Sequence, residues 1–133
     1  MKTLVWIDRE LVPLLHRSLI AEHGGSLGIR DAGLLESALT RPEQLHAYGK
    51  KPDVFALAAA YAFGISKTHP FVDGNKRVAL VLTRVFLLRN GYELDATNDE
   101  KYHIFYGLAS GSVSEDDLAQ WLRVKACPIE GDK

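Results

Sequence analysis

Apolar side chains recur every three or four residues through most of this chain, and glycine, proline and capping residues divide the pattern into about six helical segments. The first helix is predicted from Asp8, an N-cap residue, to His23, where Gly24 and Gly25 end it. Its core-facing residues are predicted to be Leu11, Leu14, Leu15 and Leu19. The short β-branched stretch before it, residues 3–7, forms either a minor strand or a lead-in segment.

The second helix is predicted to begin after a cap at Asp31 and to end near Thr40, because Pro42 follows. Residues 42–52 are polar and contain Gly49 and two prolines, a composition typical of a loop. We therefore expect a loop or flap between the second helix and the third.

Two helices with almost no polar face are predicted on either side of a short polar stretch. Asp53 is expected to cap the first, over residues 54–68, and the second is expected from Asn75 to Asn90, where Gly91 ends it. A helix that is apolar on all sides lies in the centre of a fold. These two helices should therefore form the core, with the stretch that joins them at the heart of the molecule.

Two further helices complete the pattern. The fifth is predicted from Thr97 or Asn98 to about Ser110. Its core-facing residues are predicted to be Tyr102, Phe105, Tyr106 and Ala109. The last is predicted over residues 115–126, because a capping box begins at Ser114. The pattern as a whole predicts an all-α bundle.

Composition narrows the class of protein further. The 133 residues are 47% hydrophobic and 25% charged, which predicts one globular domain, assigned to residues 1–126, with a frayed tail at 127–133. Sixteen Lys and Arg against seventeen Asp and Glu provide no overall field for nucleic acid or a membrane. Cys127 is the only cysteine, and no apolar run has the length of a leader or a membrane span. The expected location is the cytoplasm.

The stretch that joins the two central helices carries the candidate chemistry. Residues 69–77 read His-Pro-Phe-Val-Asp-Gly-Asn-Lys-Arg. Pro70 biases His69 away from the helical region, so the imidazole is expected to lie exposed at a helix end. After a tight turn at Gly74, the first turn of the next helix offers N–H groups together with Lys76 and Arg77. This combination predicts an anion site strong enough for a polyphosphate.

Two other side chains complete the predicted reaction centre. Asp73 is placed to hold a magnesium ion that bridges phosphates, and His69 is the one group here of a type that titrates near neutrality. Taken singly, each residue has an ordinary structural explanation. A histidine before a proline commonly ends a helix, an aspartate before a helix commonly caps it, and cations in a first turn are commonly solvated surface residues. However, cations in a first helical turn oppose the helix dipole, so they need a nearby anion or another reason outside the helix to be tolerated there. The chemistry indicated is transfer from a nucleotide to a hydroxyl.

Most of this stretch matches the motif of the Fic family, and one residue is similar to a variant in the Doc (death-on-curing) branch. The matching residues are His69, Pro70, Phe71, Asp73, Gly74, Asn75 and Arg77, and the variant residue is Lys76. The run from Gly28 to Ala38 also resembles the Doc branch, so the resemblance extends over nearly the whole chain. It implies a compact Fic/Doc-type helical bundle with a flap loop.

The resemblance implies a role for each residue of the site. It makes His69 the general base, Asp73 the Mg²⁺ ligand and ATP the nucleotide. The residues implied to bind the nucleotide are Gly74, Asn75, Lys76 and Arg77, with Lys67 standing where the Doc branch has an arginine. The residues implied to dock an extended target segment at the flap are Gln44, Leu45, His46, Ala47 and Tyr48. Asn75 either orients the loop through local hydrogen bonds or binds phosphate, and the resemblance favours phosphate.

Two departures bear on the kind of transfer. Fic proteins that attach AMP have glycine in place of Lys76, which leaves space for the terminal phosphates, and a phosphate-gripping arginine in place of Leu80. The resemblance to Doc therefore implies a protein kinase that presents the γ-phosphate, with a threonine of elongation factor Tu as substrate and arrested translation as the consequence. AMP transfer is the alternative. A second alternative is a non-catalytic module whose basic loop holds nucleic acid or an acidic peptide.

The same resemblance implies a toxin in a toxin–antitoxin pair. Fic proteins that inhibit themselves carry a Ser/Thr-x-x-x-Glu-Gly/Asn helix, which this sequence lacks. Control is therefore expected from a separate Phd-like antitoxin, whose flexible C-terminal tail folds onto the domain near the motif. Neither nucleic acid nor a membrane is an expected direct partner.

Overall fold

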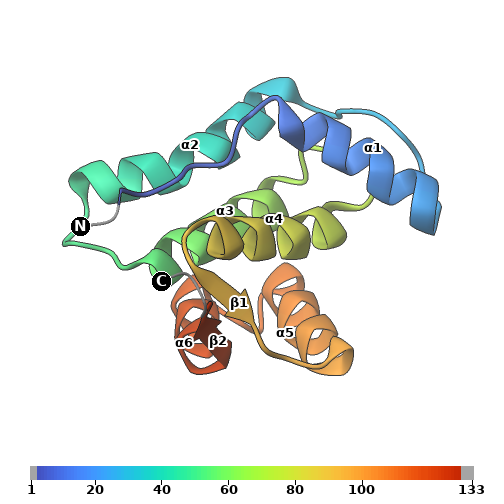
Figure 1. Cartoon of the computed structure of the whole chain (residues 1–133). Helices are drawn as coiled ribbons and strands as arrows, with labels where there is room; N and C mark the ends of the chain where they lie inside the picture. The colour runs from blue at the N-terminus through green and yellow to red at the C-terminus, as the bar shows by residue number, and fades with distance from the viewer. Residues whose placement is uncertain (1–2, 130–133) are drawn as a thin grey trace.

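The protein is an all-α bundle with a small two-stranded sheet, which confirms the predicted class (Figure 1). A computed structural model describes residues 3–129. Its elements are α1 (Leu11–His23), α2 (Ala32–Tyr48), α3 (Val54–Thr68), α4 (Asn75–Arg89), β1 (Tyr92–Leu94), α5 (Asn98–Ser110), α6 (Glu115–Lys125) and β2 (Ala126–Pro128). None of the helices within 3–129 combines the length and the apolarity needed to cross a membrane.

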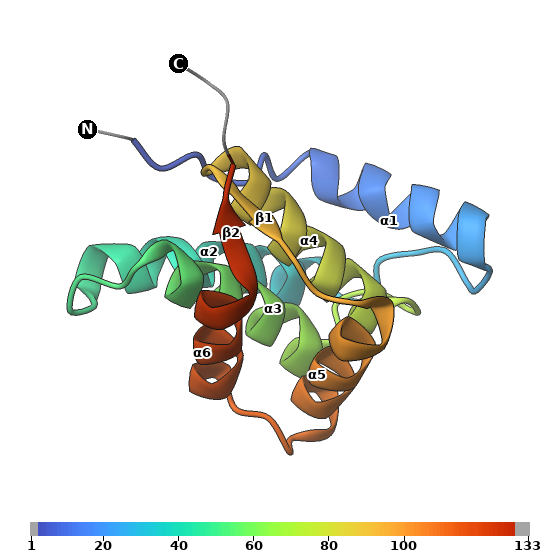
Figure 2. The ribbon, with the colours of Figure 1, turned by 60° about the horizontal axis from the view of Figure 1, so that its bottom comes forward.

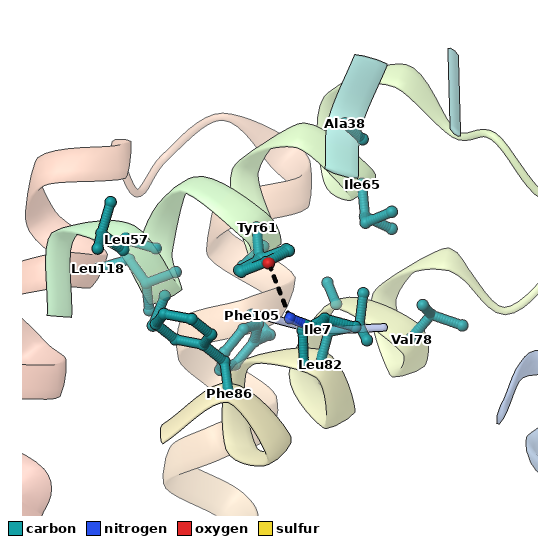
Figure 3. Packing of buried hydrophobic residues seen from close by; sticks show 14 of the residues in the cluster. Ile7, Ala38, Leu57, Tyr61, Ile65, Val78, Leu82, Phe86, Phe105 and Leu118 are labelled. Carbon is teal, nitrogen blue, oxygen red and sulfur yellow. Dashed lines mark hydrogen bonds between the residues drawn. The ribbon is translucent and has the colours of Figure 1, made fainter. Parts of the chain in front are cut away.

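The two apolar helices lie at the centre, as predicted. Helices α3 and α4 run side by side, with α1 and α2 on one side and α5 and α6 on the other (Figures 1 and 2). Figure 3 shows Tyr61 of α3 near Phe86 of α4, and the two ring centroids are 5.1 Å apart. The buried Tyr61 hydroxyl accepts a hydrogen bond from the Ile7 N–H at 3.2 Å, which ties the N-terminal segment to this core.

Four predicted helix caps are confirmed. Asp31 accepts from the Leu34 N–H at 3.0 Å and Asp53 from the Ala56 N–H at 2.8 Å, and capping boxes begin α5 at Thr97 and α6 at Ser114. The Asp53 carboxylate also pairs with Arg123 of α6 at 2.7 Å. Burial by itself raises the pKa of Asp53, but the hydrogen bonds from Arg123 and Ala56 outweigh burial and hold that pKa below its usual range. The start of α3 is thus tied to α6.

The predicted end of the second helix near Thr40 is wrong, because α2 continues through Pro42. A proline removes one intrahelical hydrogen bond, and here contacts from a distant segment support the helix across that point. The Arg9 guanidinium donates to Glu36 at 2.9 Å, to Thr40 at 2.7 Å and to Glu43 at 2.8 Å. These acceptors lie before and after Pro42, so one side chain bridges the turn that the proline weakens.

The predicted flap over residues 42–52 is mostly helical for the same reason. Gln44, Leu45, His46, Ala47 and Tyr48 form the last turns of α2. The connection to α3 is only residues 49–53. At a rise of about 1.5 Å per residue, these five residues lie about 18 to 24 Å along the helix axis from Ala32, the first residue of α2.

The first helix differs from its prediction in its start and in its buried face. Helix α1 begins at Leu11, and the Asp8 carboxylate accepts from the Glu10 N–H at 3.0 Å in the turn before it. Its buried residues are Val12, His16 and Ile20. Of the four leucines predicted to face the core, Leu15 and Leu19 are half-buried and pack against it, whereas Leu11 and Leu14 are exposed. Two faces of this helix have residues at helical spacing, the predicted leucine face and the face with Val12, His16 and Ile20. The second is the buried face, and its His16 packs against the loop before α4.

At the two ends of the described chain, the lead-in alternative for residues 3–7 is correct, and part of the predicted tail is ordered. Residues 3–7 are not a strand; the Asn90 side chain donates to the Val5 carbonyl at 3.0 Å and accepts from its N–H at 2.9 Å. Cys127 lies in β2 opposite Glu93 of β1, so this part of the predicted frayed tail is ordered. The rest of that tail, 130–133, lies outside the described residues.

Candidate active site

The predicted reaction stretch forms the connection between α3 and α4, and Phe71 anchors it. The Phe71 side chain is 1% exposed. It stacks on the buried His16 ring of α1 at a centroid distance of 4.0 Å. The His16 Nε2 lies 2.8 Å from the Asp73 carbonyl oxygen, which only accepts, so Nε2 carries the proton. Helix α1 therefore supports the loop through His16.

Asn75, the first residue of α4, closes the loop on itself. Its side-chain oxygen accepts from the Phe71 N–H and its amide donates to the Phe71 carbonyl, each at 3.0 Å, in a buried environment. Both ends of the carboxamide are thus engaged in local hydrogen bonds, which favours the loop-orienting alternative, and Asn75 also lines the cleft described below. Gly74, which precedes α4, adopts φ 80°, a value that favours glycine.

His69 ends α3 as predicted. It adopts the left-handed conformation, φ 50° and ψ 59°, which lies away from the right-handed helical region as expected before a proline. A non-glycine residue in this region is strained and requires support from its surroundings. The His69 side chain is exposed, as predicted.

Arg30 supplies that support. Its guanidinium donates to the Thr68 carbonyl and to the His69 carbonyl, each at 2.7 Å. The backbone N–H groups of Arg30 and Asp31 both donate to the Pro70 carbonyl, at 2.7 and 3.1 Å. The last carbonyls of α3, which lack helical partners, are thereby bound, and the backbone that carries the imidazole is fixed.

An extended segment lies alongside this loop. The Val72 N–H donates to the Gly28 carbonyl at 3.0 Å, and Ile29 forms an antiparallel bridge with Phe71. Leu27 and Ile29 are exposed. The irregular stretch next to His69 is therefore residues 24–31, between α1 and α2, and not the residues that were predicted to form a flap.

Asp73 lies at the end of the loop nearest this segment. One carboxylate oxygen accepts from the Ser26 N–H at 3.1 Å and the other from the Gly74 N–H at 2.9 Å. Each carboxylate oxygen keeps a further acceptor site, and the side chain is exposed at the edge of a cleft. No cluster of three or more potential ligands occurs within residues 3–129. One carboxylate fits magnesium, which takes its other ligands from phosphates and water.

The cleft beside this loop has a volume of about 770 Å³. It opens between the start of α4 and α5. Its basic lining residues are Lys76, Arg77, Arg84 and Lys101, and its acidic ones are Asp73 and Asp99. The Lys76 Nζ lies 5.6 Å from the centre of the Tyr106 ring. The excess of basic groups over acidic ones suits an anionic ligand.

Two predicted site residues do not line this cleft. The Lys67 Nζ lies over the Phe63 ring at 5.7 Å. His69 borders the loop outside the cleft, and its ring forms no hydrogen bond within the described part of the chain. The structure thus brings together Asp73, Gly74, Asn75, Lys76 and Arg77, with His69 exposed beside them.

Several residues near the site escaped the sequence prediction. His16 shares a face with Val12 and Ile20 at a spacing of four residues, and Arg84 follows Arg77 by two helical turns, so both had a periodic signal. Arg30 had none, since its partners lie 38 and 39 residues further along the chain. The predicted inward orientation of Tyr102 and Tyr106 is wrong: both are exposed in the cleft, and Phe105 is buried.

Comparison with known proteins adds three matches. A model of the Fic/DOC family matches residues 6–87, which include α1 to α3, the loop and most of α4. The chain is 33% identical over 117 residues to the protein named "Protein kinase doc" of Escherichia phage P1, covering 88% of this chain and 92% of that one. It is 42% identical over 96 residues to "Toxin Doc" of Mycolicibacterium smegmatis, covering 71% of each chain.

Proposed function

The chain belongs to the Fic/DOC family, and from this premise we propose that it is a protein kinase that transfers the γ-phosphate of ATP to a Ser or Thr hydroxyl. The observation that supports the proposal most directly is the arrangement at the start of α4. Lys76 and Arg77 line a basic cleft beside the first-turn N–H groups, and the exposed His69 borders the same loop. A relative is named a protein kinase.

In the proposed reaction, His69 takes the proton of the target hydroxyl. The hydroxyl oxygen forms a bond to the γ-phosphorus as the bond from that phosphorus to the β,γ-bridging oxygen breaks, and ADP leaves. Lys76, Arg77 and the first-turn N–H groups of α4 that follow Gly74 stabilise the charge on the transferred group. Asp73 would hold Mg²⁺, which neutralises charge on the phosphates when bound.

The proposed target is an extended protein segment, with a threonine of elongation factor Tu as the specific hydroxyl. Its docking edge was expected at Gln44–Tyr48, but these residues are helical and lie at the end of α2 remote from the loop. The extended segment at residues 24–31, which pairs with the loop, is the better-placed edge. We propose that the target backbone lies along it and brings its hydroxyl to His69.

Incubation with bacterial lysate, magnesium and ATP labelled at either the α or the γ position tests the reaction. We expect protein labelled only from the γ position. Label from the α position would contradict the kinase proposal and support AMP transfer. One residue favours AMP transfer as the second candidate. AMP-attaching Fic proteins have their second arginine at the position of Leu80, and Arg84 lines the cleft one helical turn beyond that position. No label from either position would favour the non-catalytic binding module.

We further propose that the chain is the toxin of a toxin–antitoxin pair, arrests translation in the cytoplasm and is controlled by a Phd-like antitoxin. The name "Toxin Doc" of one relative supports this proposal. Purification from the native host should recover a small partner protein, and expression without that partner should stop growth. Harmless expression together with the absence of such a partner would contradict it.

Replacing Arg30 with alanine should lower kcat for γ-phosphate transfer about 10- to 100-fold, because the Thr68 and His69 carbonyls each lose a guanidinium hydrogen bond and the imidazole shifts. The KM for ATP should change little, since Arg30 does not line the cleft. Steady-state kinetics would separate these effects. Arg30→Lys, which can restore one of the two bonds, should recover part of kcat, whereas equal activity of Arg30→Ala and the unmodified protein would contradict the positioning role.

A further inference from the structure

Two tyrosines on α5 form an aromatic surface that the proposed reaction does not use. Tyr102 and Tyr106 lie one helical turn apart and are 61% and 51% exposed. Their rings are nearly parallel, with an interplanar angle of 19° and centroids 5.8 Å apart. The packing of α5 against the core is made by Phe105 and Leu108, which are buried. The fold therefore does not require either tyrosine to be aromatic.

The tyrosine surface adjoins the basic end of the cleft. Both rings line the same cleft as Lys76 and Arg77, and the Lys76 Nζ lies 5.6 Å from the centre of the Tyr106 ring. Tyr102 continues the aromatic surface by one further step, 5.8 Å from Tyr106. A molecule that is anionic at one end and planar and aromatic at the other would meet complementary groups along the whole cleft.

We propose that Tyr102 and Tyr106 form a stacking platform for the base of the nucleotide whose phosphates bind at the start of α4. The inference rests on the proposed function, in that a nucleotide must enter this cleft. Bases stack on aromatic side chains through their planar faces, whatever the base. Lys101 and Arg84, on opposite walls, add positive charge near the platform, and Asp99 is the acidic residue on that side.

The charges distinguish this ligand from a docked apolar segment of protein. An apolar partner would place four cationic residues, Lys76, Arg77, Arg84 and Lys101, against groups that cannot compensate them. A nucleotide compensates these cations with its phosphates and covers the tyrosine rings with its base. The platform also fixes one end of the nucleotide, so it helps to decide which phosphate is presented beside Lys76.

Calorimetric titration of Mg·ATP and of inorganic tripolyphosphate into the whole protein tests the platform. Tyr102→Ala is the variant of choice, because Lys76 lies over Tyr106 and not over Tyr102. Stacking of a base on an aromatic residue is worth enough to change the Kd for ATP by roughly tenfold or more. We expect that loss for ATP, while the Kd for tripolyphosphate, which has no base, stays within about twofold. Tyr102→Phe keeps the ring and should behave like the unmodified protein.

Each other outcome overturns a stated part of the proposal. If the unmodified protein binds ATP and Tyr102→Ala binds it equally well, the platform is wrong and the proposed function stands. If Tyr102→Ala weakens both ligands equally, the ring supports the phosphate site and not a base. If the unmodified protein binds neither ligand, the platform and the proposed function both fail. Circular dichroism of the exposed-site variant verifies that it is folded.

Discussion

Replacing His69 with alanine should lower γ-phosphate transfer about 10²- to 10⁴-fold, the usual contribution of a positioned general base. The stability of the protein and its affinity for ATP should change little. The imidazole is exposed, lies outside the cleft and forms no hydrogen bond within residues 3–129, so its removal leaves no buried group unsatisfied. Initial rates with γ-labelled ATP, together with thermal unfolding, measure both expectations.

A second variant controls for the backbone of this position. His69 adopts φ 50°, where asparagine is better tolerated than alanine. His69→Asn therefore keeps the loop conformation and removes the base, and we expect it to be as inactive as His69→Ala. Substantial transfer by His69→Asn would show that the loop geometry, and not proton abstraction, is what the histidine provides. Retained ATP binding in both variants with no transfer in either would agree with the proposed role.

Replacing Asn75 with alanine should abolish transfer and also destabilise the whole protein. The side chain satisfies both the N–H and the carbonyl of Phe71 in a buried environment, and its loss leaves two polar groups without partners. At about 1–3 kcal/mol for each such group, we expect the free energy of unfolding to fall by about 2–6 kcal/mol. Urea denaturation followed by circular dichroism measures this change.

The same variant distinguishes the two roles considered for Asn75. If Asn75 binds phosphate, its removal lowers activity and leaves stability unchanged. If it closes the loop, its removal lowers both activity and stability. Arg77→Ala is the matched comparison, since Arg77 is exposed in the cleft and its loss should reduce activity without a comparable loss of stability. Equal stability of Asn75→Ala and the unmodified protein would contradict the loop-closing role.

Local signals explain why most of the helices were predictable. The caps at Asp53, Thr97 and Ser114 each act within three residues of the helix start, so the sequence contains the whole interaction. The two apolar helices have no polar face, which leaves only the centre of the fold for them. The stretch between them was correctly placed for the same reason.

The errors arise where contacts from distant segments decide the outcome. Pro42 ended the predicted helix because nothing nearby in the sequence offsets it, and its support comes from Arg9, 27 to 34 residues away from its partners Glu36 and Glu43. Similarly, an aromatic residue at helical spacing packs in a core or lines a cleft with equal ease. Tyr102 and Tyr106 were therefore placed on the wrong side, and the cleft that exposes them forms only when α4 and α5 meet.

The closed loop between α3 and α4 also affects the entropy of ligand binding. Ordering a flexible backbone costs about 1–2 kcal/mol per residue, which a ligand that shapes its own site must supply from its binding energy. Here the loop is held before any ligand arrives, by Asn75 from within and by Arg30 and His16 from neighbouring segments. The loop is therefore a preorganised binding site for phosphate groups. The interaction energy of the phosphates contributes to affinity and is not spent on ordering the loop.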